Sequence, residues 1–134
     1  MKMHWVALIT ILTVIMQFAL VINVGLTRRK YNIQAPAVVG HPTFERAYRV
    51  QVNTIENTLI FLPSLWLFAV YINYKIAIFL GAVWLIGRLI YAVMYQLDPK
   101  KRALGFGLAA GAILILMLGS LYGIVKELLW SATP

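Results

Sequence analysis

A polar stretch at residues 45–57 carries the side chains most able to do chemistry, and it stands directly before an apolar run. Its polar groups fall at i, i+4, i+7 and i+8, the spacing of one helix face: Arg49, Asn53, Glu56 and Asn57. The apolar run, residues 58–72, is shorter than the about 20 residues with which a helix crosses a bilayer. Part of the polar stretch must therefore enter the membrane, where a carboxylate is costly and indicates a functional site.

A second polar group falls at i, i+3 and i+7 farther along the chain: Arg88, Tyr91 and Tyr95. The turn between the two stretches is short, residues 73–75, so the helices that flank it are expected to be antiparallel neighbours. The number of residues between the turn and each group is similar, so the two groups are expected to lie side by side in the same third of the membrane. Arg102 is expected to lie at the membrane surface.

Together these residues predict a site for a ligand with several anionic groups and one ammonium group. Arginines bind carboxylates through paired hydrogen bonds, and Glu56 can bind the amine. Arg102 can hold a nearby thiol as its thiolate, because a thiol with a pKa of about 8.5 is little ionised at neutral pH. The alternative is that Glu56 and Arg88 only neutralise each other's charge.

A site at this depth must be positioned by helices that cross a membrane, and the composition of the chain agrees with that. The chain has 134 residues, of which 62% are hydrophobic and 12% charged, whereas soluble domains have about 25% charged residues. The pattern predicts an all-α, integral membrane four-helix bundle in one domain, 1–134, with helices at about 5–27, 44–72, 76–97 and 103–127. Small residues in the last helix permit close helix contact: Gly105, Gly107, Gly111, Gly119 and Gly123. The chain has no cysteine, so a reacting sulfur atom must arrive on a substrate.

The net charge of +8 is interpreted as a membrane orientation signal and not as a nucleic-acid-binding surface. Most cations lie in or beside the first and third loops: Arg28, Arg29, Lys30, Arg46, Arg49, Lys100, Lys101 and Arg102. These loops are expected to face the cytoplasm, with both termini outside and anionic lipid nearby. The membrane would be a bacterial inner membrane or the endoplasmic reticulum, and no nucleic-acid partner is expected.

The run at residues 44–56, FERAYRVQVNTIE, resembles the signature of the MAPEG family, the membrane-associated proteins in eicosanoid and glutathione metabolism. The segment GRLIY at 87–91, together with Tyr95, Lys101 and Arg102, is similar to the second block of that family. The resemblance covers essentially the whole chain. It is strongest to the branch of type 2 microsomal glutathione transferase and cysteinyl-leukotriene synthase.

The resemblance implies a homotrimer that binds glutathione between adjacent protomers, as a co-substrate and without a metal. The residues that it assigns to glutathione binding are Arg28, Arg49, Gln51, Asn53, Glu56, Asn57, Tyr91 and Tyr95, of which Arg28 and Gln51 would reach in from the neighbouring protomer. Arg102 would be the catalytic residue that stabilises the thiolate. Arg29 would assist the electrophile, and Arg88 would help to order the site.

The function that this resemblance implies is a membrane glutathione transferase for a lipophilic electrophile or lipid hydroperoxide, and a glutathione peroxidase reaction is compatible with the same site. Asn57 stands where the nearest members usually have tyrosine, so an aromatic contact with glutathione is lost. One alternative is a non-catalytic lipid- or fatty-acid-binding member of the same family. Another is a small multidrug exporter, but such exporters typically carry their glutamate in the first helix, which has no acid here.

Overall fold

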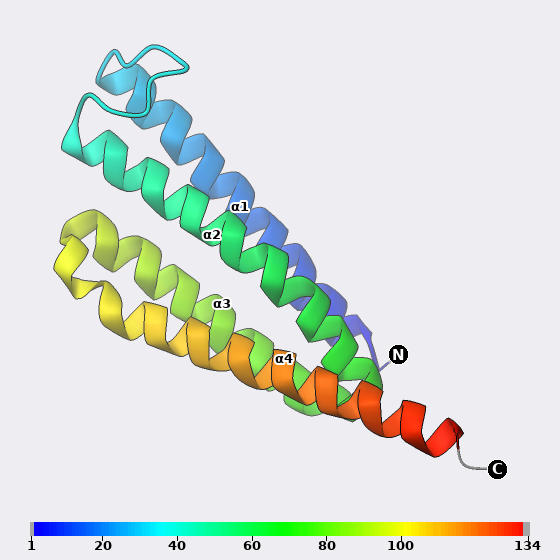
Figure 1. Ribbon diagram of the computed structural model, residues 1–134. Coiled ribbons are helices and arrows are strands. Elements are labelled where there is room, and N and C mark those ends of the chain that lie inside the picture. Colours follow the sequence, from blue (N-terminus) through cyan, green and yellow to red (C-terminus); the bar gives the residue numbers. More distant parts are fainter. Residues whose placement is uncertain (1, 133–134) are drawn as a thin grey trace.

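The computed structural model describes residues 2–132, and within them the chain is helical without any strand, which confirms the all-α prediction. The α-helices are α1 (His4–Lys30), α2 (Pro42–Phe68), α3 (Tyr74–Leu97) and α4 (Ala103–Ser131). A π-helical turn, η1 (Ala69–Asn73), joins α2 to α3, and a 3-10 turn, η2 (Pro99–Arg102), joins α3 to α4 (Figure 1).

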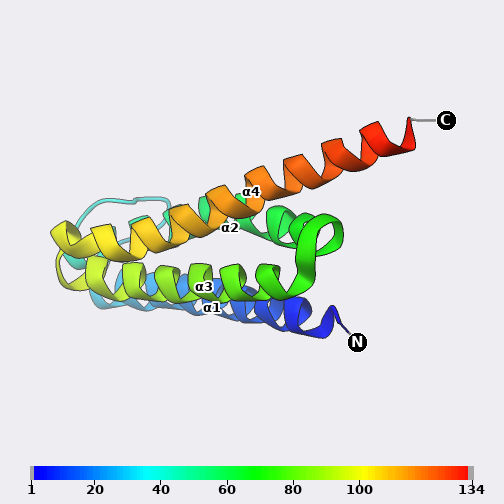
Figure 2. The ribbon, with the colours of Figure 1, turned by 90° about the horizontal axis from the view of Figure 1, so that it is seen from below.

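The chain runs back and forth along one direction (Figures 1 and 2). Because α2, η1 and α3 are continuous, three helical segments are long and apolar enough to cross a membrane: His4–Lys30, Pro42–Leu97 and Pro99–Ser131. We call the end with residues 31–41 and η2 the loop end, and the opposite end, with η1, the turn end. The four membrane crossings and the trimer stay predictions.

The reversal at the turn end is stabilised by the side chain of Asn73. Its Oδ1 accepts hydrogen bonds from the backbone N–H groups of Lys75 (2.8 Å) and Ile76 (3.2 Å), which begin α3 and would otherwise lack partners. The backbone therefore leaves η1 and enters α3 without an extended loop.

The interior and the exterior of the bundle are both apolar. Inside, the rings of Phe61 and Trp84 stack with their centroids 3.8 Å apart, and both side chains are fully buried. Outside, each α-helix exposes large apolar side chains, such as Phe18 (65%), Leu59 (72%) and Phe79 (67%). A surface of this kind suits a hydrocarbon environment, so the protein is an integral membrane protein.

Helices α3 and α4 approach most closely near Gly87 and Gly105. A Cβ atom placed on Gly105 would lie 2.6 Å from the carbonyl oxygen of Gly87 and 2.7 Å from Tyr91 Cα. Both are backbone atoms, which cannot move aside as a flexible side chain would. Gly107, on the other side of α4, has no such neighbour within 4 Å.

We expect Gly105→Ala to lower the free energy of unfolding by about 1–3 kcal/mol, because the helices must separate to admit the methyl group. Thermal unfolding in detergent, followed by circular dichroism, measures this change. Gly107→Ala is the matched control and is expected to be neutral or slightly stabilising, since alanine favours helix. Equal unfolding midpoints for the two variants would contradict the close approach.

Candidate functional site

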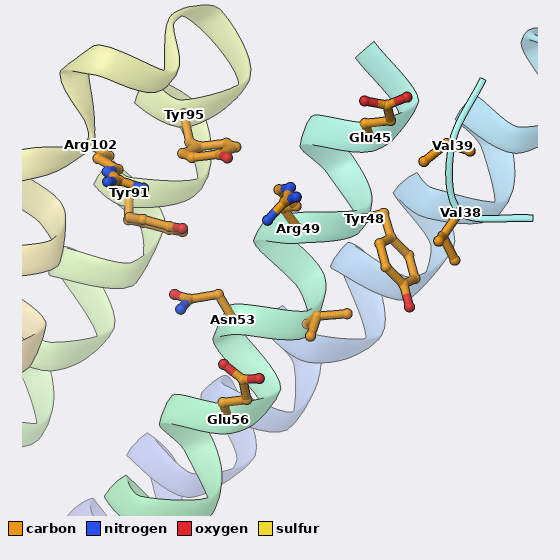
Figure 3. A pocket seen from close by; sticks show the side chains of 11 residues that line it. Val38, Val39, Glu45, Tyr48, Arg49, Asn53, Glu56, Tyr91, Tyr95 and Arg102 are labelled. Carbon is orange, nitrogen blue, oxygen red and sulfur yellow. The ribbon is translucent and has the colours of Figure 1, made fainter. Parts of the chain in front are cut away.

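A pocket of about 390 Å³ lies at the loop end between α2 and the α3–η2–α4 side of the bundle (Figure 3). Its lining residues come from the loop at 31–41, from one face of α2, from α3 and from η2: Val38, Val39, Glu45, Tyr48, Arg49, Val52, Asn53, Glu56, Tyr91, Tyr95 and Arg102. Two segments far apart in the sequence thus form its walls.

The α2 wall follows from the two faces of this helix. Its apolar face is buried in the bundle, with Val50 and Phe61 both at 0% exposure. The polar face therefore turns toward the pocket, where Arg49 and Glu56 are exposed and Asn53 is half-buried. In Figure 3 the side chains of Arg49 and Asn53 extend from α2 toward the opposite wall.

The opposite wall is built from α3 and η2. Tyr91 and Tyr95 are buried, and their rings lie with centroids 5.5 Å apart at an interplanar angle of 29°. Arg102, the last residue of η2, is exposed and lines the same pocket. The close approach of Gly105 to Tyr91 holds α4 against α3 directly beyond this point.

Arg88 lies beneath the pocket and is fully buried. Its Nη2 donates to Asn53 Oδ1 (2.9 Å) and to Thr54 Oγ1 (2.6 Å), and its guanidinium carbon lies 4.1 Å from the centroid of the Tyr91 ring. Within residues 2–132 no ion pair joins Arg88 to Glu56. The charge-neutralisation alternative is therefore not what the structure shows, and Glu56 faces the pocket with its carboxylate available.

Arg28 and Arg29 lie outside this pocket. Arg28 Nη1 donates to the carbonyl oxygen of Ala37 (2.7 Å), and its guanidinium lies 4.7 Å from the centroid of the Phe44 ring. In this way Arg28 holds the loop at 31–41 against the start of α2. Together with Arg29 it lines a separate hollow at the end of α1.

Gln51 and Asn57 also lie outside the pocket, although both are on α2. Asn57 Nδ2 donates to the backbone oxygen of Asn53 (3.0 Å), so its amide is bonded along its own helix. Of the residues predicted for the site, the pocket brings together Arg49, Asn53, Glu56, Tyr91, Tyr95 and Arg102.

Several lining residues were not predicted. Helical spacing could have found Glu45, Tyr48 and Val52, because Glu45 lies four residues before Arg49, and Tyr48 and Val52 lie eight and four residues before Glu56. Val38 and Val39 come from the loop, where no periodic pattern marks which side chains turn inward.

Comparison with known proteins identifies the family of the chain. The model of the MAPEG family matches residues 6–122. The chain is 48% identical over 127 residues to an uncharacterized protein of Synechocystis sp. (95% of this chain, 93% of the relative). It is 38% identical over 123 residues to microsomal glutathione S-transferase 2 of Homo sapiens (92% and 84%). It is also 32% identical over 126 residues to leukotriene C4 synthase of Cavia porcellus (94% and 84%). The chain therefore belongs to the MAPEG family.

Proposed function

We propose that this protein is a membrane glutathione transferase that joins the sulfur of glutathione to a lipophilic electrophile, and that the same site can use glutathione to reduce a lipid hydroperoxide. The observation that carries the proposal is the pocket at the loop end, in which the polar face of α2 meets Tyr91, Tyr95 and Arg102. The names of the relatives, a glutathione S-transferase and a leukotriene C4 synthase, support it.

The charges of the pocket suit those of glutathione. This tripeptide carries two carboxylates, one ammonium group and one thiol. The pocket offers the guanidinium groups of Arg49 and Arg102, the carboxylate of Glu56 and the amide of Asn53. Guanidinium groups bind carboxylates and stabilise thiolates, and a carboxylate binds an ammonium group.

We assign the chemical step to Arg102. Its positive charge would favour the thiolate over the thiol, with the thiol proton released to water at the open loop end. The sulfur lone pair then forms a C–S bond with the electrophile, and the electron pair of the broken bond leaves on the departing oxygen or halide. With a lipid hydroperoxide, the thiolate sulfur forms an S–O bond to the terminal oxygen, the O–O bond breaks, and the lipid leaves as the alcohol after taking a proton. The sulfur of a second glutathione then displaces the hydroxyl of the sulfenic acid, which gives glutathione disulfide and water.

The assembly that we propose is a homotrimer with four membrane crossings per protomer and the loop end in the cytoplasm. The positive residues at the loop end support this orientation, since Lys100, Lys101 and Arg102 occupy η2. In a trimer, Arg28 and Gln51 would extend toward the site of a neighbour, and Arg29 would lie beside the electrophile. This agrees with their position outside the pocket of their own protomer.

The proposal is tested by mixing detergent-purified protein with glutathione and a lipophilic electrophile and measuring the conjugate. We expect Glu56→Gln to raise the KM for glutathione about tenfold, because the ammonium group loses its partner. Glu127→Gln removes an equal charge from the far part of α4 and is expected to leave KM unchanged.

Absence of both glutathione binding and conjugation in the wild type would contradict the proposal. Equal KM values for Glu56→Gln and Glu127→Gln would contradict the role of Glu56. Binding of glutathione without conjugation would select the non-catalytic lipid-binding function on the same fold.

A further inference from the structure

Two arginines join the walls of the pocket, and they do so in opposite directions. Arg88 extends from α3 to Asn53 and Thr54 on α2, beneath the pocket. Arg46 extends from α2 to the end of α3, where its Nη1 donates to the carbonyl oxygens of Gln96 (3.2 Å) and Leu97 (3.4 Å). Neither arginine lines the pocket, which lies between the two connections.

The bonds of Arg46 cap α3 from another helix. The last carbonyl groups of an α-helix have no partners within it, and they carry the negative end of the helix dipole. The N–H of Asp98 bonds to the carbonyl of Met94 (2.9 Å). The guanidinium of Arg46 donates hydrogen bonds to the carbonyls of Gln96 and Leu97, and a positive charge at this end of a helix is favourable.

The η2 turn is built directly on this capped end. The carboxylate of Asp98 accepts a hydrogen bond from the backbone N–H of Lys100 (3.0 Å). The backbone carbonyl of Asp98 accepts one from the backbone N–H of Lys101 (2.9 Å). Arg102 is the last residue of the turn. Because the connection from Leu97 to Arg102 is so short, the end of α3 determines where Arg102 stands relative to α2.

We propose that Arg46 is a positioning residue for Arg102. It fixes the separation between the α2 wall, which carries Arg49 and Glu56, and the turn that carries Arg102. The inference rests on the proposed function, because it concerns how the glutathione thiol is placed against Arg102. Arg46 touches neither the thiol nor the electrophile in this proposal, and it acts only through the end of α3.

The first test compares Arg46→Met, Arg46→Lys and the control Lys101→Met, which removes an equal charge from η2. Thiolate absorbance of bound glutathione is followed against pH, and glutathione affinity is measured by calorimetry. We expect Arg46→Met to lower the thiolate signal at neutral pH about tenfold, with a smaller change in affinity, because a small displacement of a catalytic group is costly. Arg46→Lys, which can still donate to the carbonyls, is expected to restore most of the signal.

The second test does not depend on glutathione. Because the chain has no cysteine, the pair Thr43→Cys and Lys100→Cys can carry two spin labels, one at the start of α2 and one on η2. We expect a narrow distribution of label distances across the loop end, a broad one when Arg46→Met is added, and a narrow one again with Arg46→Lys.

The two tests separate failure of this inference from failure of the proposed function. Equal thiolate signals in Arg46→Met and Lys101→Met, or an unchanged label distribution in Arg46→Met, would overturn the positioning role. A lower unfolding temperature in Arg46→Met without any change in label distances would also overturn it. If the wild type binds no glutathione, the proposed function fails, while the label distances still decide whether Arg46 sets the separation of the walls.

Discussion

Replacing Arg102 with leucine is expected to lower thiolate formation and kcat/KM for conjugation about a hundredfold, a typical loss when one charge-stabilising group is removed from an active site. Arg102 lines the pocket from η2, opposite the α2 face that carries Glu56 and Asn53. Without its charge, the thiolate would face the rings of Tyr91 and Tyr95 and, on the other wall, Arg49. Thiolate absorbance in the ultraviolet, measured at neutral pH with saturating glutathione, reports the effect directly.

Lys100→Leu is the matched control for Arg102→Leu. Lys100 lies on the same turn and carries the same charge, but it does not line the pocket. A general effect of positive charge at the loop end would lower both signals alike. An unchanged thiolate signal in Arg102→Leu would show that another group activates the thiol, and Arg49 would then be the candidate.

Replacing Arg88 with methionine is expected to weaken glutathione binding about tenfold while leaving the fold equally stable or more stable. Arg88 is 0% exposed, and within the described residues its Nε and Nη1 have no hydrogen-bond partner. A buried charge whose partners are neutral oxygens is costly, so an apolar side chain of similar length removes that cost. Thr54 keeps a partner in the Val50 carbonyl (2.7 Å).

The loss of binding follows from the amide of Asn53. Arg88 occupies its Oδ1 at 2.9 Å, so Nδ2 is the group left to donate to a ligand in the pocket. Without Arg88 the Asn53 amide is free to rotate, so its Nδ2 is no longer held in position to donate to the ligand. Calorimetry with glutathione and thermal unfolding in detergent measure the two effects separately.

Arg88→Lys provides the contrast. It keeps a buried charge but not the planar guanidinium that lies against the Tyr91 ring, so it is expected to be less stable than both the wild type and Arg88→Met. A lower unfolding temperature in Arg88→Met, together with unchanged glutathione affinity, would mean that Arg88 serves the fold and not the site.

Helical spacing was sufficient to predict part of the pocket, although it also included Asn57, which lies outside it. Arg49, Asn53 and Glu56 share one face of α2 because their spacing follows the helix period. The short turn before α3 was sufficient to predict that Tyr91 and Tyr95 lie opposite them. These predictions depend only on backbone geometry, which polar and apolar patterns determine well.

The partners of long side chains could not be predicted in this way. Depth along the helix indicated Glu56 as the partner of Arg88, but the structure joins Arg88 to Asn53 and Thr54. Which residues Arg88 contacts depends on side-chain rotamers and on the direction in which each wall of the pocket faces. The periodicity of the sequence shows neither. The bonds of Arg46 to the end of α3 depend on the same details.

The glycines of α4 show a similar limit. Their spacing indicated close helix contact, but not which of them makes it. Gly105 lies against the backbone of α3, whereas Gly107 and Gly111 have no neighbour within 4 Å. The rotation of α4 about its own axis separates these cases, and a helix that is apolar on all sides carries little pattern to specify that rotation.

The chain reverses direction in different ways at the two ends of the bundle. The two ends are therefore expected to differ in their susceptibility to proteolytic cleavage. At the turn end, the backbone of η1 leaves helical angles at Asn73 and re-enters the helix at Tyr74, so no extended strand is available to a protease cleft. At the loop end, residues 31–41 lack regular helix and bring Val38 and Val39 to the pocket. Cleavage of the folded protein would therefore begin there, on one side of the membrane, and a ligand held against the two valines would slow it.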